Sequence, residues 1–255
     1  MGTLCIDIGN TRCKLALFEG EALRQFRLSG HDELPATVRQ LAESHCFDLC
    51  LYSAVGRGAD ALESALHALA CPCRRLHAGL PGLPVSVDYA TPRTLGSDRL
   101  AAAVGARTLW PASDVLIADF GTCATFDLLT ADGHLRGGNI APGLRLRLAA
   151  MHRGTQALPE VEPCTAEGSG LLGTDTPSAM QKGAWQGLVF ETEGYFARLK
   201  ARHTGLRLLL TGGEAEIVRS QLSPEAAKAA AVEPDLVLIG LRAAAEAVRK
   251  SPHTQ

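Results

Sequence analysis

Two short acidic motifs of the pattern Asp-x-Gly-[Asn/Thr] carry the residues in this chain that are best suited to chemistry. Asp7-Ile8-Gly9-Asn10 follows the apolar run 4–6, and Asp119-Phe120-Gly121-Thr122 follows the apolar run 115–118. A carboxylate suits a cation, while backbone N–H groups and a hydroxyl at a turn suit anionic oxygens, so each motif suits a metal-bound polyphosphate. Taken alone, each is more typical of an ordinary β-hairpin turn capped by its acid.

The repetition of the motif favours a functional role. Each copy leads into a second apolar run, 14–18 and 123–129, and then reaches a Gly turn at Gly20 or Gly133. Similarity over this length indicates two related halves rather than a solenoid of short units. Two such hairpins facing each other would hold the phosphates of a nucleotide from both sides.

A third segment, Gly96-Ser97-Asp98-Arg99, leads into a predicted helix over residues 100–110. Ser97 is predicted to be its N-cap, which places Asp98 in the first turn. An Asp there is also typical of simple stabilisation by the helix dipole. Arg99 is unusual at this end of a helix and indicates a bound carboxylate or phosphate.

Composition limits the classes of protein to consider. The 255 residues are 46% hydrophobic and 20% charged, which is ordinary for a globular protein with one or two domains. The formal net charge of −2 gives no reason to expect a nucleic acid or an anionic membrane as partner. We see neither a membrane span nor a signal peptide and expect a cytoplasmic protein. Its eight cysteines are therefore expected to be reduced, and Cys71-Pro72-Cys73 with His77 lacks a standard zinc spacing.

The predicted elements form an α/β pattern. Three strands are followed by alternating helices and strands, which indicates a mixed sheet, and residues 110–113 give the best domain boundary. We therefore predict domains at 1–112 and 113–255. The further predicted elements are a helix over 59–70, a helix beginning at Pro142, a long helix from Pro177 to about residue 200, a strand over 206–210 before Thr211-Gly212-Gly213, and a last strand over 236–239.

In order along nearly the whole chain, these motifs resemble those of type III pantothenate kinases, members of the acetate and sugar kinase, Hsp70 and actin superfamily. Each motif is weak alone, but the ordered set is specific. The matching segments are Asp7-Ile8-Gly9-Asn10-Thr11, Gly96-Ser97-Asp98-Arg99, Asp119-Phe120-Gly121-Thr122, residues 137–143, Arg153-Gly154-Thr155, Leu158-Pro159, Asp175-Thr176 and Thr211-Gly212-Gly213. The resemblance implies an actin-like ATPase fold with two ribonuclease-H-like domains, a nucleotide cleft between them, and a homodimer.

The resemblance also implies roles for individual residues. Asp98 would accept the proton of the substrate hydroxyl, and Asp119 would bind a monovalent cation such as K⁺ or NH₄⁺. Asp7 would lie near the Mg²⁺ that accompanies ATP. The residues implied to bind ATP are Asp7, Ile8, Gly9, Asn10, Thr11, Arg12, Cys13, Lys14 and Thr122. The residues implied to bind pantothenate are Tyr89, Gly96, Ser97, Asp98, Arg99 and Thr176.

Three functions follow from these observations. The first is ATP-dependent phosphorylation of pantothenate to 4'-phosphopantothenate, the first step of coenzyme A biosynthesis. The second is another activity of the same scaffold, such as a sugar or acid kinase or a polyphosphate hydrolase; residues 89–99 argue against it. The third is a non-enzymatic regulator of gene expression, but the sequence has neither a DNA-binding helix signature nor a basic patch.

Overall fold

The computed structural model describes residues 2–54, 66, 69, 71–164 and 170–251, and it divides the chain into two compact units. The first unit comprises Met1–Ala112, Leu129–Gly137 and Asp235–Gln255, and the second comprises Ser113–Leu128 and Gly138–Pro234. These units differ from the predicted domains in two segments, since residues 129–137 and 235–255 belong with the first unit. The two-domain division at residues 112 and 113 stays a prediction.

The first unit contains a mixed sheet with the strand order β3-β2-β1-β4-β5. Its strands are β1 (Gly2–Ile8), β2 (Cys13–Glu19), β3 (Ala22–Ser29), β4 (Leu49–Ala54) and β5 (Cys73–Arg75). β1, β2 and β3 pair antiparallel, as two hairpins require, whereas β4 is parallel to β1 and β5 is parallel to β4. The helices and short elements are α1 (Leu34–Ser44), β6 (Ser86–Val87), η1 (Pro92–Thr94), α3 (Ser97–Leu109) and α8 (Leu236–Lys250).

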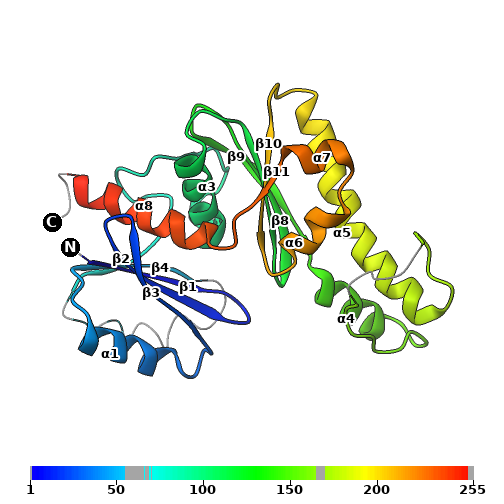
Figure 1. The fold of residues 1–255 in the computed structure, drawn as a ribbon, viewed down its shortest axis with the longest axis horizontal. Helices are drawn as coiled ribbons and strands as arrows, with labels where there is room; N and C mark the ends of the chain where they lie inside the picture. The colour runs from blue at the N-terminus through cyan, green and yellow to red at the C-terminus, as the bar shows by residue number, and fades with distance from the viewer. Residues whose placement is uncertain (1, 55–65, 67–68, 70, 165–169, 252–255) are drawn as a thin grey trace. The chain divides into compact units, whose positions relative to one another are not determined.

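Helices cover both faces of this sheet (Figure 1). On one face α1 turns its buried Leu34, Val38 and Leu41 into the core formed with β1, β2 and β4. On the other face α3 and α8 pack side by side. They approach so closely that a Cβ on Gly240 would lie 1.8 Å from the carbonyl oxygen of Ala101. Glycine is therefore required there, and α3 is fixed against the C-terminal helix.

The second unit is built on the strands of a second mixed sheet, with the order β11-β10-β7-β8-β9-β6. β10 lies parallel to both β7 and β11. Besides β6, whose bounds are given above, the strands of this sheet are β7 (Val115–Phe120), β8 (Cys123–Leu129), β9 (His134–Pro142), β10 (Arg207–Gly212) and β11 (Ala230–Val232). The helices of the unit are α4 (Leu144–Gly154), α5 (Thr176–Lys200), α6 (Ala215–Gln221) and α7 (Pro224–Ala229).

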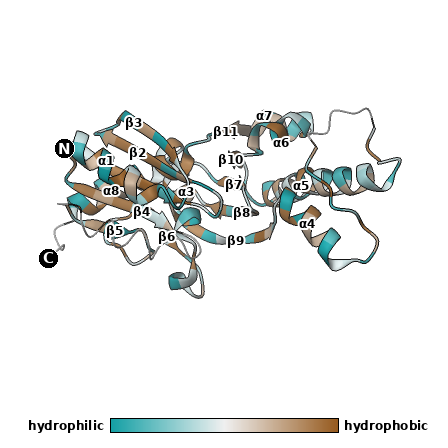
Figure 2. Ribbon diagram, turned by 90° about the horizontal axis from the view of Figure 1, so that it is seen from below, coloured by the Kyte–Doolittle hydropathy of each residue, from teal (hydrophilic) through white to brown (hydrophobic). Residues whose placement is uncertain are grey.

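Apolar residues are concentrated where the strands pack against helices, as strand β2 shows in Figure 2. In the second unit the largest fully buried side chain is that of Trp185 on α5. It belongs to a core that also holds Phe120, Phe126 and Leu148. No helix among the described residues is long and apolar enough to cross a lipid bilayer.

Three sequence-based assignments were wrong. Residues 236–239 begin α8 instead of forming a strand, because a short apolar run is equally typical of a buried helix face; the last strand is β11. Pro142 ends β9, and α4 begins at Leu144 after Gly143. Ser97 is the first helical residue of α3 and not its cap. The predicted helix over 59–70 falls mostly outside the described residues.

Candidate functional site

The first hairpin places a carboxylate and an ammonium group opposite each other. Asp7 on β1 pairs with Lys14 on β2, and the turn is closed by the Gly9 N–H, which donates to the Arg12 carbonyl oxygen at 3.1 Å. The other residues predicted to bind ATP here are Ile8, Asn10, Thr11 and Cys13. The turn residues 10–12 are exposed, as a ligand-binding turn requires, whereas Ile8 and Cys13 are buried and anchor the two strands.

Asp7 lies in an environment that disfavours its charge. Desolvation by the surrounding protein and the nearby Asp98 carboxylate raise its pKa to about 6, although Lys14 and a hydrogen bond from the Ser53 hydroxyl oppose this. The Lys14 ammonium is shared, since its Nζ lies 3.4 Å from a carboxylate oxygen of Asp235. Two neighbouring carboxylates in a poorly solvated position create a local need for a cation.

A chain of hydroxyl groups joins this hairpin to the start of α3. Ser53 lies on β4 directly beside Asp7 in the parallel pairing, and its Oγ is 3.2 Å from the Oγ of Ser97. The Ser97 hydroxyl also accepts from the Ala54 N–H at 3.0 Å. Both serines are buried, so these contacts fix α3 relative to Asp7. Sequence reasoning missed Ser53, whose only signal is a polar residue inside an apolar strand.

Asp98 occupies the first turn of α3, as predicted. One of its carboxylate oxygens accepts from the Arg99 N–H at 2.8 Å, and the same oxygen lies 2.4 Å from the position that a Cβ on Gly96 would take. Any side chain at residue 96 would displace the Asp98 carboxylate. The glycine of the motif is therefore explained by the space that Asp98 needs.

The structure also brings Tyr89 and Arg99 together. The Arg99 guanidinium carbon lies 5.6 Å from the centroid of the Tyr89 ring, which is a cation–π distance, and its Nη1 is 3.5 Å from the Tyr89 hydroxyl. Arg99 is buried, with only 6% of its surface exposed. The first unit therefore combines Asp7, Asp98, Arg99 and Tyr89.

The second hairpin has a shorter turn. β7 ends at Phe120 and β8 begins at Cys123, and the Gly121 N–H donates to the Cys123 carbonyl oxygen at 3.0 Å. Thr122 is exposed at the tip, as its predicted phosphate contact requires. Its carbonyl oxygen accepts from the Gly143 N–H at 3.0 Å, which ties the turn to the start of α4.

Asp119 lies beside a backbone carbonyl oxygen, that of Phe120. A Cβ on Gly212 would lie 2.5 Å from an Asp119 carboxylate oxygen and 2.4 Å from the Phe120 carbonyl oxygen. Such a set of oxygen donors fits a hard cation. Among the described residues no group of three or more His, Cys, Asp or Glu side chains could hold a metal ion, so any cation here would depend on backbone oxygens as well as Asp119.

Thr176 is the first residue of α5 and is exposed. The helix begins at a capping box in which an Asp175 carboxylate oxygen accepts from the Ser178 N–H at 2.8 Å, as the Asp-Thr-Pro sequence predicts. Thr176 belongs to the second unit and Tyr89 to the first. A common role for the two in binding one substrate stays a prediction.

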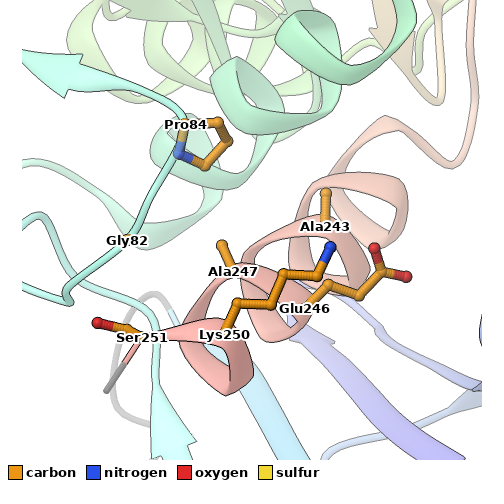
Figure 3. Close-up of a pocket in the computed structure, with 7 residues that line it drawn as sticks. All are labelled: Gly82, Pro84, Ala243, Glu246, Ala247, Lys250 and Ser251. Carbon is orange, nitrogen blue, oxygen red and sulfur yellow. The ribbon is translucent and has the colours of Figure 1, made fainter. Parts of the chain in front are cut away.

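An open pocket of about 480 Å³ in the first unit lies away from all of these residues. Figure 3 shows Ala243 and Ala247 of α8 facing the loop that carries Gly82 and Pro84. None of the predicted site residues lines it, and its lining is mainly apolar, so we do not assign the chemistry to it.

Comparison with known proteins gives a consistent result. The family model described as type III pantothenate kinase matches residues 3–198. A type III pantothenate kinase of Phocaeicola vulgatus is 39% identical over 83% of this chain and 86% of its own length. One of Porphyromonas gingivalis is 34% identical over 93% of this chain and 95% of its own length.

Solved structures with a similar fold have much lower sequence identity. A Campylobacter jejuni protein described as a putative Baf family transcriptional activator is 17% identical over 98% of this chain and all of its own, with a TM-score of 0.61. A Streptomyces griseus ROK family glucokinase is 14% identical over 98% of this chain and all of its own, with a TM-score of 0.57. At these identities the likeness concerns the fold alone, and it confirms the predicted α/β fold of the actin-like ATPase and sugar kinase type.

Proposed function

Because the chain belongs to the type III pantothenate kinase family and is thus a kinase, we propose that it transfers the γ-phosphoryl group of ATP to pantothenate. The product would be 4'-phosphopantothenate, and the reaction would be the first step of coenzyme A biosynthesis. The observation that carries the proposal is the grouping of Asp98, Arg99 and Tyr89 beside the first hairpin. A carboxylate for an alcohol proton and a guanidinium for a carboxylate match the two ends of pantothenate.

The residues of this chain would act mainly by position and charge. The primary alcohol oxygen of pantothenate forms the new bond to the γ-phosphorus, the bond from that phosphorus to the oxygen of ADP breaks, and Asp98 takes the alcohol proton. Arg99 binds the substrate carboxylate with Tyr89 beside it. We assign the turn residues 9–12, Lys14 and Thr122 to the phosphates of ATP.

Two cations fit the residues present. The clustered charge of Asp7 and Asp98 fits Mg²⁺ bound with ATP near Asp7, where it would neutralise phosphate charge. The oxygens of Asp119 and Phe120 beside Gly212 fit a monovalent cation, K⁺ or NH₄⁺. Replacing K⁺ by a bulky tetraalkylammonium ion should lower the turnover rate of the natural chain. In an Asp119→Ala variant the turnover rates in the two salts should be equal, with a ratio of about one. An Asp119→Ala variant with the natural K⁺ response would contradict the assignment.

A homodimer is the third part of the proposal. Several large apolar side chains of the second unit are exposed, and a second copy of the chain would bury them. They are Ile140, Leu171, Leu172 and Phe190, each more than half exposed. In the part of the chain that the structure describes, nothing outside α5 lies within 4 Å of the position that a Cβ on Gly183 would take, which supports a close approach by another chain. Light scattering should give twice the 26.9 kDa chain mass; a monomer with full activity would contradict this.

An ATP turnover assay with several acceptors tests the function directly. ADP should form with pantothenate and Mg²⁺ present, and mass spectrometry should identify phosphopantothenate. Turnover with a sugar, or with water alone, would instead support another activity of the same scaffold.

As a test of the acceptor site, Thr176→Ala should raise the KM for pantothenate more than the KM for ATP.

A further inference from the structure

Three cysteines lie together at the edge of the first sheet, away from the proposed catalytic residues. Cys50 on β4 pairs with Cys73 on β5 in the parallel register, and Cys71 lies just before β5. The Cys50 N–H donates to the Pro72 carbonyl oxygen at 2.9 Å, which fixes the two strands to each other. The Cys73 side chain is within hydrogen-bonding reach of both other thiols.

The three thiols differ in accessibility. Cys50 is fully buried in the apolar core beneath α1, whereas Cys71 and Cys73 are partly exposed. The Cys73 sulfur also contacts the Leu66 carbonyl oxygen at 3.4 Å. Among the described residues no cluster is arranged to hold a metal ion. Chemistry between two of the thiols therefore fits this group better than metal binding.

We propose that Cys73 is an oxidation site that reacts with a peroxide and then forms a disulfide with Cys50. The Cys73 sulfur attacks one peroxide oxygen, the O–O bond breaks, and a sulfenic acid and water form. The Cys50 sulfur then displaces the hydroxyl from Cys73 and releases a second water. In total two thiols lose two electrons and two protons, and hydrogen peroxide is reduced to two water molecules.

Strand geometry favours Cys50 over Cys71 as the partner. Paired residues on neighbouring strands are about 4.8 Å apart, which lies within the usual Cα separation of a disulfide. The bridge to Cys50 follows the existing pairing of β4 with β5, whereas Cys71 lies before β5 and has no partner in that register.

The electrostatic environment selects Cys73 as the attacking group. A hydrogen bond from the Cys50 thiol lowers the pKa of Cys73 to about 7, which stabilises its thiolate. Burial raises the pKa of Cys71 to about 12, and the hydrogen bond to Cys73 together with burial raises that of Cys50. Together with its partial exposure and its pairing with Cys50, this makes Cys73 the thiol of the three that we expect to react first.

Limited oxidation of the reduced full-length protein tests this inference without an activity assay. The protein is treated with one equivalent of hydrogen peroxide, blocked with N-ethylmaleimide, digested and analysed by mass spectrometry. We expect a linked pair of peptides containing Cys50 and Cys73. The exposed Cys46 supplies a matched control, so Cys46→Ser should give the same linked pair. Absence of the linked pair, or a Cys71–Cys73 link in its place, would overturn the proposal.

Two variants separate the steps. Cys73→Ser should abolish peroxide consumption by the cluster, and Cys50→Ala should leave a Cys73 sulfenic acid that dimedone traps. In the natural protein, alkylation of Cys73 should reach half its maximal rate near pH 7. Oxidation of Cys50 in Cys73→Ser, or an alkylation midpoint of Cys73 well above pH 7, would contradict the role given to Cys73.

Discussion

The two hairpins share a motif and a strand arrangement but differ in what surrounds the acid. In both, the acid pairs in parallel with a hydroxyl residue of the next strand, Asp7 with Ser53 and Asp119 with Thr211. Around Asp7 the neighbours are ionisable and hydroxyl side chains, whereas the Asp119 carboxylate and the Phe120 carbonyl oxygen both lie beside Gly212. A repeated motif therefore does not mean a repeated environment: ionisable and hydroxyl side chains surround the first acid, and a backbone oxygen lies beside the second.

The largest effect should come from Asp98, which gives the first hairpin its catalytic neighbour. Asp98→Asn keeps the shape but cannot accept a proton, so kcat should fall by about 10²–10⁴-fold. Steady-state kinetics and the melting temperature should be measured on the same variant. Asp32→Asn, which changes an exposed carboxylate of the same unit, should leave kcat unchanged. A lowered melting temperature with near-normal kcat would make Asp98 only a helix-stabilising charge.

The second prediction separates the two acids by pH. The folded pKa of Asp7, about 6, exceeds its ordinary value of 3.8, so the folded state holds this proton more tightly than the unfolded state. Its contribution to stability is therefore fully present below pH 3.8 and is lost as pH rises through about 6. As pH rises between these limits, the free energy of unfolding of Asp7→Asn should increase by up to about 3 kcal/mol relative to that of the natural chain. Denaturant unfolding without nucleotide measures this difference.

Asp88 provides a control of opposite sign. Its pKa is lowered, first by the hydrogen bond from His134, so its contribution is present above the unfolded pKa and is lost as pH falls. Asp88→Asn should therefore lose stability relative to the natural chain near neutral pH but not in acid. A pH-independent difference between Asp7→Asn and the natural chain would show that Asp7 is not held in an unfavourable environment.

The third prediction concerns the oxygens around Asp119. Gly212 has φ +91, and its Cβ would overlap the Phe120 carbonyl oxygen, so Gly212→Ala should cost about 1–3 kcal/mol of unfolding free energy. The adjacent Gly213 has no atom within 4 Å of its Cβ position, and Gly213→Ala should change stability by less than about 0.5 kcal/mol. Equal melting temperatures for the two variants would refute this geometry.

The smallest effect should come from the Tyr89 hydroxyl. Tyr89→Phe keeps the ring over Arg99 but removes its hydroxyl contact, so the KM for pantothenate should rise by about two- to tenfold and the KM for ATP should not change. Tyr195→Phe in the second unit serves as the control and should alter neither KM. A larger change in the KM for ATP would place the acceptor pocket elsewhere.

Local sequence signals predicted most of the fold, whereas the roles given to the site residues stay predictions. The Gly turns, the alternation of strands and helices, and the cap before Pro177 depend on neighbouring residues, and the structure follows them. The contacts of Ser53 with Asp7 and Ser97 could not be predicted, because they join three segments far apart in sequence. The apolar run 236–239 was misassigned for the same reason, since its partner is α3 and not a neighbouring residue.

The packing of α8 on α3 also affects when the first sheet can finish folding during translation. The strands of the first sheet precede the second unit in the chain, whereas α8, the helix that covers one of their faces, follows it. Until Gly240 reaches its place against Ala101, apolar surface on β1 and α3 has no permanent cover. The first sheet therefore gains this cover only after the second unit has been translated, and a nonsense codon before α8 would leave apolar surface on β1 and α3 uncovered.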